Sequence, residues 1–308
     1  MEYLILMVKG FFVGIALIIP GLSGGTLAIY LGIYEKLLHA IGHIFSEMKQ
    51  SLQFLIPLGV GMAIAIIGLA NLLGYLIDIN SLVVLLFFIG LLVGGMKDIY
   101  RQAIPKQHPI EATTILSGVV SFSLIIVLIV FGKLSDSTGI ATIDITFFNI
   151  ILLVLLGMAA SMTMIVPGVS GSALLIVLGY YTAIVTNVIG NILDFSELTY
   201  HLSVIVPFTI GAAIGIIGFS KVIEYVLQHY PKQTYFAIFG FLAGSVIAMF
   251  FEINDPATGT THDVQEPIYT HLLEFLGDNI VSFIGAIVLF VGGVILSRYL
   301  TRLIPEKE

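Results

Sequence analysis

Long apolar stretches alternate with short polar segments along the whole chain. Most of these stretches are close to the ~20 residues that cross a bilayer as one helix. The pattern therefore predicts six membrane-spanning helices, within residues 52–76, 81–96, 112–132, 202–220, 234–251 and 279–297.

Two further apolar regions are each interrupted by a proline-glycine phrase. The first phrase, Pro-Gly-Leu-Ser-Gly-Gly, occupies residues 20–25, and the second, Pro-Gly-Val-Ser-Gly-Ser, occupies residues 167–172. Each phrase has an apolar arm on both sides. Such a region can form one broken span, two spans, or a re-entrant hairpin that leaves the membrane on the side where it entered.

The sequence is duplicated. A shift of 147 positions superposes the two phrases and also places Gly179 on Gly32, and a shift of 150 places Pro207 on Pro57. We therefore predict two homologous repeats within one integral membrane domain. Their boundaries are 1–132 for the first repeat, 133–145 for an external connecting loop and 146–308 for the second repeat.

The basic residues predict the orientation, because short cytoplasmic loops collect Lys and Arg. If each phrase region returns to its own side, 11 of the 12 basic residues share one side and only Lys133 lies on the other. If each phrase region crossed the membrane once, the basic residues that follow it would be distributed over both sides, so we reject a single crossing. Each half then crosses three times, which inverts the second repeat and makes both termini cytoplasmic.

The distribution of basic residues cannot distinguish a hairpin from a pair of spans. In both cases the chain returns to the side from which it entered, so each half still has an odd number of crossings. We favour hairpins because the Pro-Gly phrases leave backbone N–H and C=O groups without helical hydrogen bonds at membrane depth. Such groups are tolerated only where protein or a water-filled cavity surrounds them. The predicted fold is an all-α polytopic membrane protein with two inverted-topology repeats. Each repeat combines a Pro-Gly-broken re-entrant helical hairpin with three transmembrane helices.

Composition excludes a water-soluble globule. Hydrophobic residues make up 58% of the 308 residues and charged residues 10%, and the mean hydropathy is +1.10. The chain has no cysteine, which excludes disulfides, thiolate metal sites and cysteine nucleophiles. The apolar run at residues 4–19 belongs to the repeat, so we expect it to be retained. We expect the bilayer and a lipid as partners and no nucleic acid.

The two phrases predict an anion site. A helix that starts after each phrase presents unpaired backbone N–H groups and its positive dipole end, and glycine lets an anion approach the main chain closely. The alternative is that these small residues only kink helices and let them pack closely. The predicted phosphate-binding residues are Gly21, Ser23, Gly24, Gly25, Thr26, Gly168, Ser170, Gly171 and Ser172.

Both phrases, the Gly-Ile-Tyr-Glu run at residues 32–35 and the whole-chain repeat resemble the DUF368 family, also called PopT. These are polyprenyl-phosphate transporters of the bacterial inner membrane. The resemblance implies a flippase that returns undecaprenyl phosphate from the outer to the inner leaflet for reuse in cell-wall synthesis. The second copy departs from the first, with Ala173 in place of Thr26 and Thr182 in place of Glu35. This leaves open whether both copies bind phosphate equally.

Two other function classes fit part of the pattern. Membrane undecaprenyl-pyrophosphate phosphatases carry a similar phrase, but its arginine, which clamps phosphate, is replaced here by Gly24 and Gly171. Phosphoryl transfer without a cationic or metal clamp is hard to stabilise, so we expect no enzyme. A small-anion secondary transporter would use the same donors and stays open as an alternative.

Polar residues near the phrases suggest coupling and a pathway. Glu35 is the acidic residue closest to either phrase, and we expect it to couple transport to protons, although Na⁺ is also possible; the alternative is a solvated partner for Lys9 or Lys36. No other cofactor is expected. Possible pathway residues, which could instead be belt aromatics or packing groups, are Tyr34, Asn71, Tyr181 and Asn187.

One helix face carries residue types that can bind a metal. Glu35, His39 and His43 recur at intervals of four, so they share that face. Such a stripe at a helix end is more often a wet interface, and no further ligand is evident nearby in the sequence. The sequence therefore predicts no metal site.

Overall fold

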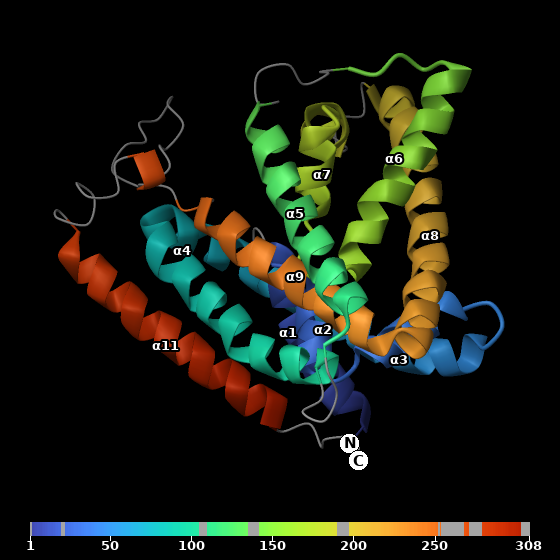
Figure 1. Ribbon diagram of the computed structural model, residues 1–308. Coiled ribbons are helices and arrows are strands. Elements are labelled where there is room, and N and C mark those ends of the chain that lie inside the picture. Colours follow the sequence, from blue (N-terminus) through green and yellow to red (C-terminus); the bar gives the residue numbers. More distant parts are fainter. Residues whose placement is uncertain are drawn as a thin grey trace.

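The computed structural model describes residues 2–19, 22–104, 110–134, 142–189, 197–251, 253, 268–270 and 279–302. Within these ranges every regular element is a helix (Figure 1). The elements are α1 (Glu2–Ile18), α2 (Gly24–Tyr30), α3 (Tyr34–Gly42), α4 (Met48–Ala103), α5 (Ala112–Leu134), α6 (Phe147–Ile165), α7 (Gly171–Val177), the π-helix η1 (Thr182–Ile189), α8 (Leu198–His229), α9 (Pro231–Phe251), the 3-10 helix η3 (Ile268–Thr270) and α11 (Ile280–Arg302).

Seven helices in the described ranges are long and apolar enough to cross a membrane. Six correspond to the predicted spans, and the seventh is α6, which the sequence pattern predicted as one arm of the second phrase region. Large apolar side chains such as Ile67 and Val281 remain 81% and 80% exposed, as a lipid-facing surface requires. The prediction of an all-α polytopic membrane protein is confirmed. The spans are Met48–Leu69, Asn71–Ala103, Ala112–Gly132, Phe147–Ile165, Leu198–His229, Pro231–Phe251 and Ile280–Thr301.

The long helix α4 is kinked at Asn80, whose backbone leaves the helical region with φ −158° and ψ 83°. The Asn80 side chain caps the second part of the helix, because its Oδ1 accepts a hydrogen bond from the Val83 N–H at 3.1 Å. Its Nδ2 donates to Ser282 Oγ on α11 at 3.0 Å. The kink therefore lies within the span Asn71–Ala103, and the Asn80 side chain ties this part of α4 to α11.

The duplication extends to helix packing. On α1, Gly10 lies against the Leu58 carbonyl of α4, and on α4, Gly61 lies against the Met7 carbonyl of α1. A β-carbon at either glycine would overlap the facing oxygen, so these small residues set the distance between the helices. Helices α6 and α8 repeat this arrangement, and the equivalent pairs are Gly157 with Phe208 and Gly211 with Val154.

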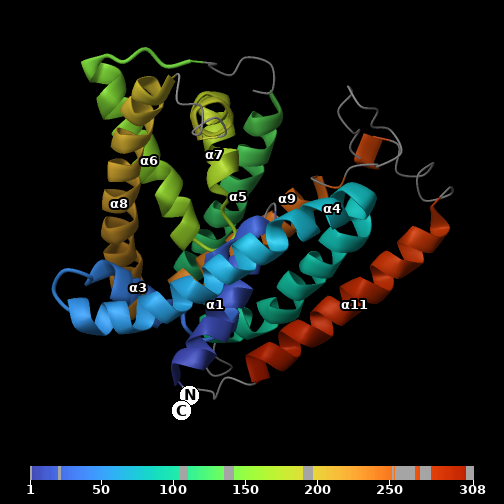
Figure 2. The ribbon, with the colours of Figure 1, turned by 180° about the vertical axis from the view of Figure 1, so that it is seen from behind.

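In each half of the sequence, the third predicted span packs on a helix of the other half. Helix α5 lies along α9, and α11 lies along α4 (Figures 1 and 2). Gly240 on α9 meets the Gly118 carbonyl of α5, and its equivalent in the first half, Gly90 on α4, meets the Phe290 carbonyl of α11. The sequence halves therefore interlock instead of forming two separate bundles.

Several helices begin or end at the same end of the molecule, and basic residues lie near these helix ends. Helices α4, α8 and α11 end there and α1, α5 and α9 begin there, at the bottom of Figure 1. Helix α3 lies across the same end (Figure 2). Basic residues in the adjoining helical turns are Lys97, Arg101, Lys221, Lys232 and Arg298.

Candidate functional site

The two phrase segments meet at the centre of the molecule. A β-carbon added at Gly25 would stand 2.7 Å from the carbonyl oxygen of Ile165 and 3.5 Å from the ring of Pro167. Ser23 Oγ donates a hydrogen bond to the Val166 carbonyl at 3.4 Å. Segments far apart in the sequence therefore form one site. Gly21, the remaining glycine predicted to bind phosphate in the first phrase, lies outside the described residues.

Each phrase starts a short helix with a serine cap. Ser23 Oγ accepts from the Gly25 N–H at 3.2 Å, and Ser170 Oγ accepts from the Ala173 N–H at 3.4 Å. Both helices also end alike, because Gly32 and Gly179 adopt φ values of 63° and 79° in matching glycine-terminated turns. The Gly25, Thr26 and Ala173 N–H groups therefore already bond to the two serines, and an anion would have to compete with Ser23 and Ser170 for these donors.

The described residues of the first phrase are buried. Ser23 is 6% exposed, and Gly24, Gly25 and Thr26 are also buried. Thr26 Oγ1 is buried and has no hydrogen-bond partner among the described residues. A buried hydroxyl without a partner costs about 1–3 kcal/mol, so this atom would gain from an incoming acceptor or donor.

The second phrase is more open. Gly168 is buried, Ser170 and Gly171 are half-buried, and Ser172 is exposed. The hydroxyls of Ser170 and Ser172 bond to one another at 2.8 Å. Where Thr26 stands in the first copy the second has Ala173, so the two copies differ both in donors and in access.

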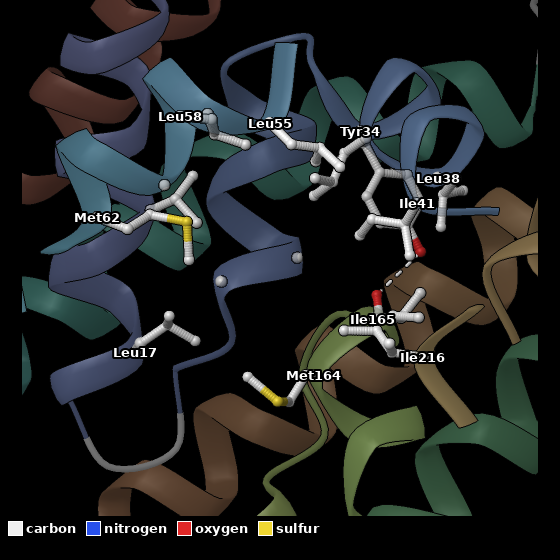
Figure 3. Close-up of a pocket in the computed structure, with 15 residues that line it drawn as sticks. Leu17, Tyr34, Leu38, Ile41, Leu55, Leu58, Met62, Met164, Ile165 and Ile216 are labelled. Atoms are coloured by element: carbon white, nitrogen blue, oxygen red, sulfur yellow. Dashed lines mark hydrogen bonds between the residues drawn. The ribbon is translucent and has the colours of Figure 1, made fainter. Parts of the chain in front are cut away.

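An apolar pocket of about 260 Å³ adjoins the first phrase (Figure 3). Gly24 and Gly25 border it, and apolar side chains from α1, α3, α4, α6 and α8 make up most of its wall. Two residues that line the pocket are also exposed on the surface of the molecule: Gly59 is exposed, and Met164 is 50% exposed. The labelled side chains in Figure 3 are Leu17, Tyr34, Leu38, Ile41, Leu55, Leu58, Met62, Met164, Ile165 and Ile216.

Of the four residues suggested for a pathway, only Tyr34 lines this pocket. Tyr34 is 4% exposed, and its hydroxyl donates to the Ile165 carbonyl at 3.0 Å, which joins α3 to the end of α6. Tyr181 is half-buried in the apolar cluster of the second half. Asn187 is half-buried on η1, and Asn71 is exposed on α4. The structure does not bring these four side chains together.

Glu35 is exposed in the first turn of α3, outside the pocket lining. The Tyr235 hydroxyl of α9 donates to Glu35 Oε1 at 3.2 Å. Of the two lysines considered as partners, Lys9 donates to the Leu31 carbonyl at 2.8 Å and Lys36 lies 5.1 Å from the centre of the Phe54 ring. Tyr235 could not be found from the sequence, because it is 200 positions away.

Two broken helices that meet at the centre of a polytopic bundle, beside an apolar pocket, are the arrangement of a membrane transporter. The chain belongs to the family described as undecaprenyl phosphate translocase-like, which it matches over residues 13–264. This confirms the family resemblance of the two phrases.

Two relatives extend the comparison over most of the chain. The polyprenyl-phosphate transporter of Staphylococcus aureus (strain NCTC 8325 / PS 47) is 31% identical over 304 residues, which cover 98% of this chain and 97% of the relative. The polyprenyl-phosphate transporter of Vibrio cholerae serotype O1 (strain ATCC 39315 / El Tor Inaba N16961) is 26% identical over 260 residues, or 80% of this chain and 77% of the relative. No solved structure matches this chain.

Proposed function

We propose that this protein is a flippase that moves undecaprenyl phosphate, or a closely related polyprenyl phosphate, from the outer to the inner leaflet for reuse in cell-wall synthesis. The observation that carries the proposal is the apolar pocket that ends at the backbone of Gly24 and Gly25. A polyprenyl phosphate needs a polar site for its head group and a continuous apolar surface for its tail. The names of both relatives agree with this cargo.

In this proposal the phosphate binds to the phrase and the first isoprene units fill the pocket. The buried Thr26 hydroxyl supplies a donor that the described residues leave unused, and glycine lets the phosphate reach the main chain. The tail leaves the pocket past Gly59 and Met164, where the wall meets the lipid-facing surface. The rest of a long tail stays in the bilayer.

The two copies of the phrase would serve the two leaflets. We infer that each phrase region is a re-entrant hairpin and that the repeats are inverted, so that the first phrase opens to the cytoplasm and the second to the outside. The buried first phrase and the exposed Ser172 agree with a state in which one copy is accessible at a time. The basic residues at the end where α1 begins and α11 ends favour a cytoplasmic location for that end in the bacterial inner membrane.

The apolar pocket favours a lipid over a small anion. A small inorganic anion needs polar walls, whereas most lining side chains here are aliphatic or methionine. A phosphatase would need a cation at the phosphate, and Gly24 and Gly171 occupy the position of the arginine in the similar phosphatase phrase.

We further propose that Glu35 couples transport to protons, with Na⁺ as the other candidate. Its contact with Tyr235 of α9 supports this role, because a change in the charge of Glu35 would act directly on a helix of the other half. Such a link is what coupling between ion and cargo requires.

The proposal is tested with purified protein in liposomes that contain a fluorescent polyprenyl phosphate. Transport is measured as the time course with which the head group becomes accessible to a membrane-impermeant quencher, with protein-free liposomes as the baseline. Uptake of inorganic phosphate in place of lipid movement would favour the small-anion alternative. Release of phosphate from polyprenyl pyrophosphate would favour an enzyme. If none of these activities exceeds the baseline, the proposal fails.

A further inference from the structure

We propose that His39, His43 and Glu224 form a site for a divalent transition-metal ion of the zinc type, and that the bound ion fastens α3 to α8. His39 lies in the last turn of α3, His43 is the residue that caps the end of this helix, and Glu224 comes from the last two turns of α8. One ligand atom from each residue lies within 4.8 Å of the other two. This inference does not depend on the transported cargo.

The distances suit a metal of this size. His39 Nδ1 is 2.7 Å from Glu224 Oε1, and His43 Nδ1 is 3.5 Å from Glu224 Oε2. A tetrahedral zinc ion with bonds of about 2.0–2.2 Å keeps its ligand atoms roughly 3.3 Å apart. Small side-chain movements would place an ion between the three groups, and His43 Nδ1 would exchange its 3.2 Å contact with the His39 carbonyl for the metal. Two imidazoles and one carboxylate favour zinc-like metals over calcium or magnesium.

Glu47 supplies an outer contact that orients one ligand. With His39 Nδ1 facing Glu224, the other ring nitrogen, Nε2, lies 3.2 Å from Glu47 Oε2. A carboxylate that accepts from the second nitrogen of a metal-binding histidine fixes the ring and raises its basicity. The rings of His39 and His43 are also stacked, with centroids 4.4 Å apart. The cluster is thus partly ordered without a metal.

The cluster carries negative charge and is open to water. The hydrogen bonds to Glu224 and then Glu47 raise the pKa of His39, because both carboxylates stabilise the protonated ring. The same carboxylates would attract a metal cation, which has to displace the proton that they stabilise on His39. The His39 side chain is 45% exposed and that of Glu224 14%, so an ion can enter from solvent while one ligand stays partly screened.

Metal binding would restrain a wall of the pocket. Helix α3 carries the two histidines, and it also carries Tyr34, Leu38 and Ile41, which line the pocket. Helices α3 and α8 belong to different halves of the sequence and pack together. An ion shared by both would therefore hold the first half against the second at the end of the molecule where α8 ends.

The test uses the full-length protein in detergent, with its affinity tag removed and metal stripped by a chelator. Co²⁺ is titrated as a spectroscopic probe, because its visible absorption intensifies in a tetrahedral site. We expect one equivalent to bind, to be displaced by Zn²⁺, and to raise the thermal unfolding temperature. Absence of saturable binding, or a spectrum like that of Co²⁺ in water, would overturn the site.

Variants identify the ligands. His43→Ala and Glu224→Gln should each abolish the tetrahedral spectrum, and Glu47→Gln should weaken binding by roughly 10–100-fold. His229→Ala is the control, since His229 is an exposed histidine of α8 whose Nδ1 contacts the Tyr225 carbonyl at 2.9 Å; it should bind Co²⁺ as the parent protein does. Metal-free unfolding temperatures show whether each variant is folded. Parent-like binding by folded His43→Ala and Glu224→Gln would assign the ion to other surface groups and end the proposal.

Discussion

Gly25 lies in the contact between the two phrase segments. An added β-carbon there would lie 2.7 Å from the Ile165 carbonyl, and a backbone atom cannot move aside as a side-chain end can. We expect Gly25→Ala to separate the phrases and to lower transport of polyprenyl phosphate by at least about tenfold, or about 1.4 kcal/mol in the transport barrier. The liposome assay measures this.

A glycine on the outer surface provides the control for Gly25→Ala. Gly68 lies on α4, and a β-carbon added there would have no heavy atom within 4 Å, so Gly68→Ala should transport at the parent rate. Equal rates for Gly25→Ala and the parent protein would show that close contact between the phrases is not needed for transport.

Glu35 is the residue on which proton coupling is tested. If its carboxylate exchanges protons with the cargo cycle, Glu35→Gln should still bind lipid phosphate but lose the pH dependence of transport, which is measured across a range of external pH. Tyr235→Phe removes the hydroxyl that donates to Glu35 but keeps the carboxylate, so it should retain a pH dependence. An unchanged pH profile in Glu35→Gln would mean that Glu35 is only a surface partner of Tyr235.

Sequence patterns predicted site residues only where the signal was local. The phrases and the matching Gly32 and Gly179 could be identified from the repeat, since each depends on a few neighbouring residues, whereas the caps that the two serines form were not predicted. Contacts between the phrases, such as Ser23 with Val166, could not be predicted because they depend on how the halves pack. For the same reason, the contact between His39 and Glu224, which lie 185 positions apart, could not be predicted from the sequence.

At the scale of helices, the packing of α5 on α9 depends on a glycine contact. Gly240 faces the carbonyl of Gly118, whereas Gly218 on α8 has open space around it. Gly240→Val should therefore destabilise the protein by about 1–3 kcal/mol, the usual cost of overpacking. Gly218→Val, which adds the same side chain to another membrane helix, should have little effect.

Thermal unfolding in detergent distinguishes the two valine variants. A marked fall in the unfolding temperature is expected for Gly240→Val alone. Equal unfolding temperatures would indicate that α5 can separate from α9 without loss of stability.

Helix positions were predictable, but helix partners were not. The six apolar stretches became helices because each must satisfy its own backbone within the bilayer, which depends on length and composition. Helix α5 exposes apolar side chains such as Leu116 and Val120 on much of its surface, so its sequence does not distinguish a partner in the first half from one in the second. α6 was also expected to be one arm of a hairpin, yet it is long enough to span.

At the scale of the whole molecule, the proposed orientation can be tested by labelling, because the chain has no cysteine of its own. Gln102 is exposed near the end of α4, and Thr142 is exposed five residues before the start of α6. Helix α6 starts at the opposite end of the bundle from the end of α4 (Figure 1). In whole cells an impermeant thiol reagent should label Thr142→Cys but not Gln102→Cys. Cell lysis should make both reactive.

The labelling result also bears on the inverted repeats. An odd number of crossings separates the two positions if the first half has the predicted parity. Labelling of both variants in intact cells would therefore contradict the inverted arrangement, while leaving the helical packing unchanged.

The packing of α5 on α9 and of α11 on α4 means that partner helices are synthesised at different times. Translation produces α5 long before α9, so α5 must wait in the bilayer until its partner arrives. Helix α4 is without its partner for longer, since α11 is the last helix that the structure describes and it covers the face of α4 that carries Gly90 and Gly94. A ribosome that stops before Ile280 would release a product whose first half is unfinished, and membrane proteases could recognise it by that uncovered face.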